Sequence, residues 1–177
     1  IVNQKMNHFN IMATHKKENM LKWYNNIQKI GEKSRLGIPI TIASDPRHGV
    51  SKSPVSSNTS FFSKWPSALG LGAIGDSSIV REHANIVRQE YSAIGIKLAL
   101  GPMADVSTEP RWIRVNGTFG EDANLNAILT SAYIKGLQGD SLDVNSVASM
   151  VKHIPQGELH ESPLRRLEKS PPPLAVV

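Results

Sequence analysis

The feature that most restricts the fold of this chain is a repeated order of elements, in which a helical stretch is followed by a short apolar run. Apolar side chains recur at helical spacing in three stretches, and β-branched or aliphatic runs follow each of them. Helices are expected over residues 16–31, 77–94 and 123–138, and strands over residues 38–43, 96–100 and 147–151. Strands that alternate with helices of this length pair in parallel through crossover connections, which predicts an α/β fold.

Polar clusters follow each of the expected strands. Asp45 comes directly after the first strand, the loop of residues 105–122 follows the second, and Lys152 and His153 follow the third. In a (β/α) barrel the carboxyl ends of the strands lie on one face, where the loops that carry function gather. We therefore predict a partial TIM-type (β/α) barrel, its first half only, with one site built from these clusters.

The charged side chains of the clusters favour a substrate that is rich in hydroxyl groups or negatively charged. Arg114 offers a planar fork of donors, and Lys152 offers a point charge of different reach. A carboxylate such as Asp45 can accept two hydrogen bonds at once, which suits neighbouring hydroxyls of a sugar ring. An alternative interpretation joins Asp45, Arg111, Arg114 and Glu121 in an internal salt-bridge network, and spacing alone does not decide between the two.

Composition and missing motifs argue against several other functions. The net charge of +5 comes without a long basic block, cysteine is absent, and no window reaches the roughly 20 apolar residues of a membrane helix. No two histidines have metal-ligand spacing, so neither a metal nor a cofactor is expected. Residues 70–75 match a Gly-rich string but lack the context of a nucleotide loop, and a flexible turn is expected there. His83 lies on an apolar helical stripe and is expected to be a packed residue.

Two segments depart from the pattern of helices and strands. Residues 51–67 are rich in Ser, Asn, Pro and Thr and are expected to form a long loop, which Phe61, Phe62 and Trp65 attach to the body of the domain. Residues 159–177 lack an apolar period and include three consecutive prolines, so a disordered tail is expected there. The expected domain therefore covers residues 1–158.

A set of short motifs occurs in an order known from one family. The motifs are Gly37–Asp45 with His48-Gly49, Trp65-Pro66 with Ala68–Leu71, Arg88-Gln89-Glu90 with Gly95-Ile96, Pro110-Arg111-Trp112 through Phe119–Asp122, Gly136–Gly139, and Val151-Lys152-His153. Over about residues 6–156 the chain resembles the N-terminal domain of glycoside hydrolase family 3, the β-glucosidase and exo-glycosidase group. The Pro-Arg-Trp and Lys-His motifs together make the resemblance specific.

The resemblance implies a retaining mechanism, in which two carboxylates about 5 Å apart form and hydrolyse a covalent glycosyl-enzyme intermediate. The sugar next to the cleaved bond would be bound by Asp45, Arg114, Lys152 and His153. Arg111 and Glu121 would support the loop that carries Arg114. The nucleophile and the acid/base of the family belong to later strands and domains, so no catalytic residue is assigned here and the isolated chain is expected to be inactive.

The chain departs from the family pattern at two places. Ile113 stands where the family commonly has glycine, and its side chain is expected to crowd the loop. The family usually continues the Lys-His motif with Phe-Pro-Gly-Gly-Gly, whereas this chain continues with residues 154–158 and then a segment foreign to the family. A frame shift, a misread splice junction or a degraded gene would each produce such an ending.

The resulting prediction is a fragment of a retaining, exo-acting β-glucosidase that acts on β-linked glucosides or oligosaccharides. Two alternatives stay open: a non-catalytic carbohydrate-binding remnant, and an N-acetylhexosaminidase-type relative. The second needs a histidine in a loop after the Lys-His motif, and the tail offers only His160 in an unrelated context. No nucleic-acid or membrane partner is expected. The family resemblance is compatible with secretion, and the oligomeric state stays open.

Overall fold

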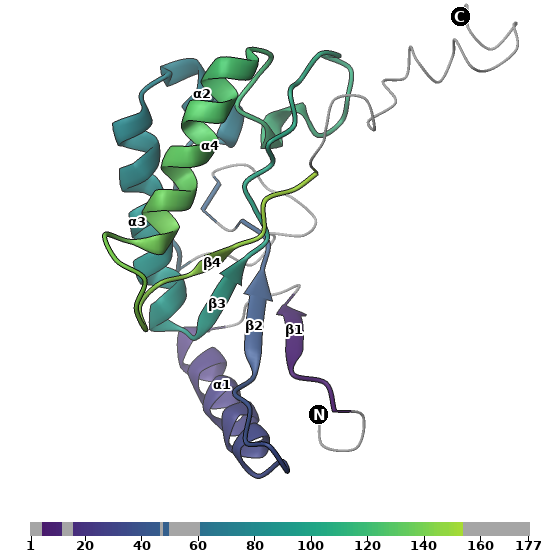
Figure 1. Cartoon of the computed structure of the whole chain (residues 1–177), viewed down its shortest axis with the longest axis vertical. Helices are drawn as coiled ribbons and strands as arrows, with labels where there is room; N and C mark the ends of the chain where they lie inside the picture. The colour runs from purple at the N-terminus through teal and green to yellow at the C-terminus, as the bar shows by residue number, and fades with distance from the viewer. Residues whose placement is uncertain (1–4, 12–15, 47, 50–60, 154–177) are drawn as a thin grey trace, which may run out of the picture.

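The computed structural model describes residues 5–11, 16–46, 48–49 and 61–153. Strands and helices alternate along this part of the chain (Figure 1). The strands are β1 (His8–Ile11), β2 (Thr41–Ser44), β3 (Ile96–Ala99) and β4 (Ala148–Ser149). The helices are α1 (Lys17–Glu32), α2 (Ala68–Ile74), α3 (Ser77–Ala93) and α4 (Ala123–Gln138), and the short 3₁₀ helix η1 covers Val115–Gly117.

The four strands form one parallel sheet in the order β1-β2-β3-β4, which is also their order in the sequence. His8 pairs with Thr41, and Leu98 pairs with Ala148, so each strand lies beside the next one along the chain. The strand arrows in Figure 1 point toward one edge of the sheet, and the loop of residues 101–122 lies beyond that edge. The predicted α/β class is confirmed, although the sequence did not predict the short edge strand β1.

Helix α1 is attached to the chain just before β2 by one side-chain amide. Gln28 Nε2 donates to the carbonyl of Ile40 at 2.7 Å, and the Ile40 amide donates to Gln28 Oε1 at 2.9 Å. Because both main-chain polar groups of Ile40 are occupied in this way, strand pairing starts at Thr41, whose amide donates to the carbonyl of Asn7. The strand predicted over residues 38–43 therefore begins later and extends to Ser44.

Helices α3 and α4 lie side by side on one side of the sheet (Figure 1). Their N-termini are capped by the carboxylates of Asp76 and Asp122. Gly136 on α4 allows a close approach, because a Cβ at this position would meet the carbonyl oxygen of Arg81 and lie 2.6 Å from the Cβ of Ala84. The helices and the sheet together bury a core that includes Ile42, Val80, Val87, Tyr91, Ile96, Leu129 and Leu137.

Residues 68–74 form helix α2, so the flexible turn predicted over residues 70–75 is wrong. The Ser67 hydroxyl accepts a hydrogen bond from the Gly70 amide and caps the helix, and Gly75 ends it with a φ of 70°. Gly72 faces the loop, where a Cβ would meet the carbonyl oxygen of Phe119. The glycine at this position serves close packing rather than flexibility.

The aromatic residues expected to attach the long loop to the domain are packed against it. Phe62 is buried, with its ring centroid 4.8 Å from that of His48, and the ring of Trp65 lies 4.9 Å from that of His83. Most of the predicted loop (residues 51–60) and all of the predicted tail (residues 159–177) lie outside the described residues. Within the described ranges, no helix has the length and apolar character to span a membrane.

Candidate functional site

The sheet brings Asp45 and Lys152 together at the carboxyl ends of β2 and β4, although 107 positions separate them in the sequence. Lys152 Nζ lies 3.1 Å from Asp45 Oδ1. Both side chains are partly exposed, at 17% for Lys152 and 28% for Asp45. The pair therefore keeps hydrogen-bonding capacity that a ligand above the sheet could use, since an ammonium group has three donors and a carboxylate has two acceptor oxygens.

Main-chain hydrogen bonds hold the segment after β4 against the segment after β3. The Lys152 amide donates to the carbonyl of Pro102 at 3.1 Å, and the Ala104 amide donates to the carbonyl of Lys152 at 2.8 Å. The peptide bond between Lys152 and His153 is cis. These two hydrogen bonds continue the parallel pairing beyond β4 and fix the main chain from which Lys152 and His153 project.

His153 points toward a buried acid that the sequence analysis did not single out. Its Nδ1 lies 3.1 Å from Oδ2 of Asp105, whose side chain is fully buried, whereas the His153 side chain is 34% exposed. The signal that could have identified Asp105 is its place in the sequence, two residues after Met103 and just past the end of β3. An acid at that place lies on the same edge of the sheet as Asp45.

Two neighbouring residues of helix α3, Glu90 and Tyr91, hold the loop that carries Asp45 and His48. The hydroxyl of Tyr91 donates to the carbonyl of Asp45 at 2.8 Å. His48 Nε2 lies 2.7 Å from Oε2 of Glu90. Burial lowers the pKa of His48, and the charge and hydrogen bond of Glu90 oppose this effect only in part. His48 is therefore a support of the loop, and its ring is 3% exposed.

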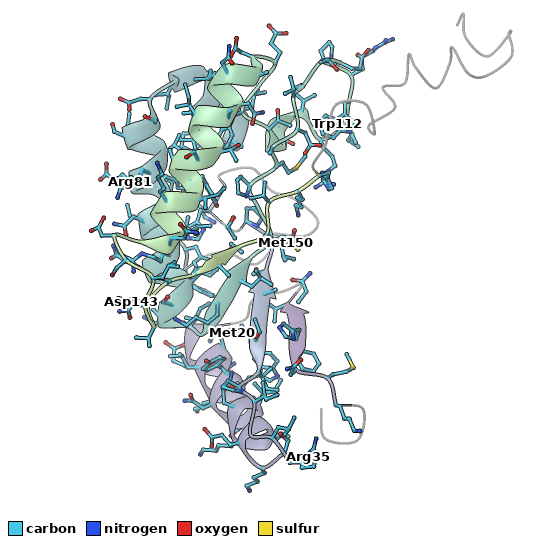
Figure 2. The ribbon with its side chains drawn as sticks, in the orientation of Figure 1. Met20, Arg35, Arg81, Trp112, Asp143 and Met150 are labelled. Atoms are coloured by element: carbon cyan, nitrogen blue, oxygen red, sulfur yellow. The ribbon has the colours of Figure 1, made fainter. Side chains whose placement is uncertain are left out.

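Arg114 lies beside the segment that follows β3. Its Nη2 contacts the sulfur of Met103 at 3.3 Å, and Met103 pairs in an isolated parallel bridge with Lys152. Arg114 therefore belongs to the same edge of the sheet as the Asp45–Lys152 pair. Trp112, labelled in Figure 2, lies in this loop beyond the upper end of the sheet. The side chain of Ile113 is 90% exposed, so the expected crowding of the loop by this residue is wrong.

Arg111 supports the loop through a partner that was not predicted. It donates to both carboxylate oxygens of Glu109, at 2.9 and 3.0 Å, and these hydrogen bonds lower the pKa of Glu109 to about 2. Glu121 is exposed and makes no ion pair with any residue that the structure describes. The alternative of one salt-bridge network is therefore wrong for this part of the chain, because Asp45 pairs with Lys152 instead.

The edge of the sheet thus carries a set of groups that can hold a polar, uncharged ligand. A carboxylate acceptor, an ammonium donor, an imidazole and a guanidinium come from the three segments that follow β2, β3 and β4: Asp45, Arg114, and the neighbouring residues Lys152 and His153. Vicinal hydroxyls can donate to a carboxylate and accept from an ammonium group at the same time. Among the described residues, no group of three or more His, Cys, Asp or Glu side chains is arranged to hold a metal ion.

Comparison with known proteins places the chain in a family. The family model described as "Glycosyl hydrolase family 3 N terminal domain" matches residues 4–163. The chain belongs to glycosyl hydrolase family 3. The match ends a few residues beyond the boundary at 158 that the sequence predicted, and that boundary stays a prediction.

Three relatives of the family 3 chain illustrate the similarity. It is 52% identical over 132 residues to a periplasmic β-glucosidase/β-xylosidase of Dickeya chrysanthemi, covering 73% of this chain and 20% of that protein. It is 44% identical over 155 residues to β-glucosidase C of Emericella nidulans, covering 86% of this chain and 25% of that protein. A solved β-glucosidase of Listeria innocua in complex with glucose matches at a TM-score of 0.62 and 30% identity, over 81% of this chain and 19% of that one.

The curated relatives are named as β-glucosidases, and the solved structures that the chain resembles have the TIM-type barrel fold that the sequence predicted for this chain. The family 3 chain spans about a fifth to a quarter of the length of the curated relatives that it matches.

Proposed function

We propose that this chain forms the sugar-binding part of the active site of a retaining, exo-acting β-glycosidase of the β-glucosidase type. The observation that carries the proposal is the contact between Asp45 and Lys152 at the carboxyl edge of a parallel sheet, in a chain that belongs to family 3. The names of the curated relatives support a β-glucoside as the substrate, and the Listeria innocua structure contains glucose.

Each group at the edge has a role in this proposal. Asp45 accepts hydrogen bonds from two neighbouring hydroxyls of the non-reducing sugar. Lys152 and Arg114 donate to hydroxyl oxygens, and His153 also contacts a hydroxyl. Arg111 keeps its loop in place through Glu109 rather than by touching the sugar. A polar pocket of this kind selects a ligand by the positions of its hydroxyls, because a missing hydroxyl leaves a site group without its partner.

The proposal places the nucleophile and the acid/base of the complete enzyme outside these 177 residues. Retention requires two carboxyl groups about 5 Å apart, one of which must carry a proton when the leaving group departs. Asp45 is engaged by Lys152 and is assigned to the sugar hydroxyls. Glu109, with a pKa of about 2, holds no proton at neutral pH. The coverage of a fifth to a quarter of the relatives' length agrees with a site completed by further chain.

The binding part of the proposal is tested by titrating the 177-residue chain with glucose in a calorimeter. We expect saturable binding that Asp45→Asn and Lys152→Ala each weaken by about tenfold or more, because hydrogen bonds to charged groups contribute roughly 1.5–3 kcal/mol. Lys22→Ala is the matched control, since Lys22 is an exposed lysine on α1. The affinity of this variant for glucose should equal that of the parent chain. Binding that survives both site variants would contradict the assignment.

The same preparation tests whether the chain lacks the catalytic carboxylates. We expect no hydrolysis of an aryl β-glucoside above the buffer rate, since a retaining site needs both a nucleophile and an acid. Hydrolysis that Asp45→Ala or Glu121→Ala abolishes would show that the chain carries a catalytic carboxylate of its own. A chain that binds glucose without hydrolysis also fits a non-catalytic remnant, and only the complete enzyme separates these two functions.

A further inference from the structure

Asp105 is a buried acid beside the groups at the carboxyl edge of the sheet. Its carboxylate is fully buried, and Oδ2 lies 3.1 Å from Nδ1 of His153. A buried charged group is costly unless hydrogen bonds compensate it, so a carboxylate that is kept in this place and turned to a histidine needs an explanation. The partner, His153, is one of the groups at the edge of the sheet that the proposed function assigns to the sugar.

The main chain around Asp105 is held from two directions. Asn126 on α4, itself buried, donates from Nδ2 to the carbonyl of Asp105 at 2.8 Å. Thr130, one turn further along α4, donates to Oδ1 of Asn126 at 3.1 Å and thereby sets the orientation of its amide. On the other side, the Ala104 amide is bonded to the carbonyl of Lys152. The main chain that carries the Asp105 carboxylate is therefore held in place, and the ring of His153 is oriented by its contact with this carboxylate.

The contact determines which ring nitrogen of His153 carries hydrogen. An ionised carboxylate only accepts hydrogen bonds, so Nδ1 must donate to it. When the ring is neutral, Nε2 then carries no hydrogen and its lone pair makes it an acceptor. A neutral histidine without such a partner can exchange between its two tautomers, whereas a hydrogen bond at one nitrogen selects one of them.

We propose that Asp105 is a positioning residue, which holds the His153 ring in its Nδ1–H form so that Nε2 accepts a hydrogen bond from a sugar hydroxyl. The inference rests on the proposed function for the identity of the ligand. The ammonium group of Lys152, next to His153, can only donate hydrogen bonds. An accepting Nε2 beside this group lets one sugar hydroxyl accept from Lys152 and donate to His153. Asp105 itself does not touch the sugar.

The test compares the parent chain with Asp105→Ala, Asp105→Asn and a surface control. Asp140→Ala is the control. The carboxylate of Asp140 is 99% exposed, and it pairs with Arg81 rather than with a group at the edge of the sheet. Nitrogen-15 spectra of the imidazole rings at alkaline pH report the tautomer of His153, with His153→Gln assigning the signal. Calorimetric titration with glucose reports the affinity of the same samples.

We expect the His153 signal of the parent chain to show the Nδ1–H form, and Asp105→Ala to lose it and to weaken glucose binding about tenfold or more. Asp105→Asn keeps an acceptor oxygen of the same shape, so it should restore the Nδ1–H form and most of the affinity. Asp140→Ala should change neither. This rescue separates positioning from a general loss of stability, and the parent spectrum remains decisive if Asp105→Ala fails to fold.

A parent chain whose His153 is in the Nε2–H form would overturn the inference, and so would an Asp105→Ala variant that keeps both the tautomer and the affinity. A parent chain that shows the Nδ1–H form but does not bind glucose would contradict the proposed function instead. In that case the control of the His153 ring by Asp105 would still be supported.

Discussion

His83 is a titratable residue in the core that makes no use of its polar atoms. The side chain is 6% exposed, and neither ring nitrogen has a hydrogen-bond partner among the described residues. The rings of Trp65, His48 and Tyr133 surround it. Burial, followed by the charge of His48, lowers the pKa of His83 to about 4. The residue is thus a packed histidine, as the sequence predicted, and it links the stability of the chain to pH.

The sign of this link follows from proton binding. Between pH 6.5 and 4 the unfolded chain protonates His83 and the folded chain does not, so the free energy of unfolding falls as the pH falls. At about 1.4 kcal/mol per pKa unit, this effect lowers the free energy of unfolding of the parent chain by roughly 3 kcal/mol between pH 7 and pH 4. We expect His83→Leu to abolish this part of the pH dependence. Urea unfolding at several pH values measures it, with exposed His8→Gln as control. Parallel pH profiles for His83→Leu and the parent would contradict this account.

At the residue scale, the sequence could predict the site only where strand order determines position. Asp45 directly follows β2 and Lys152 lies shortly after β4 in one parallel sheet, so their meeting follows from topology. The partner of Arg111 did not follow in this way: Glu109 and Glu121 are both acids of the same loop, and only the turn of the chain decides which one reaches the guanidinium. The contact of Arg114 with a sulfur atom has no signal in the sequence at all.

At the element scale, the close contact between α3 and α4 depends on Gly136. We expect Gly136→Ala to lower the free energy of unfolding by roughly 1–3 kcal/mol, because the added methyl group would meet Arg81, Ala84 and Asn85 and force the helices apart. Ser131→Ala, on the exposed side of α4, is the matched control and should stay within about 0.5 kcal/mol of the parent. Urea midpoints provide the measurement. A stabilised Gly136→Ala would mean that helix propensity outweighs the packing described here.

The long helices were predictable and the short elements were not. Helices α1, α3 and α4 each carry several turns of apolar periodicity, and α3 and α4 have an aspartate cap. Strand β1 has four residues and no fully buried side chain, so its pairing with β2 is a tertiary effect. The glycines of helix α2 favour a flexible turn by sequence alone, whereas the structure packs Gly72 against the carbonyl of Phe119, where a Cβ would not fit.

At the scale of the whole molecule, the described sheet corresponds to part of a barrel. Four parallel strands in sequential order are half of the eight strands of a TIM-type barrel, in which the active site collects residues from the ends of several strands. The sugar-binding groups proposed here come from the segments after β2, β3 and β4. A barrel completed by further strands would place catalytic carboxylates on the same face, opposite these groups.

The most direct test is a chimera in which the 132 matching residues of the Dickeya chrysanthemi relative are replaced by those of this chain. Hydrolysis of an aryl β-glucoside is the measurement. The account predicts that the chimera is active, that Asp45→Asn within it reduces kcat/KM by about tenfold or more, and that Asp140→Asn does not. A folded chimera without activity, or one whose activity is unchanged by Asp45→Asn, would contradict the claim that this chain supplies the sugar-binding part of a family 3 active site.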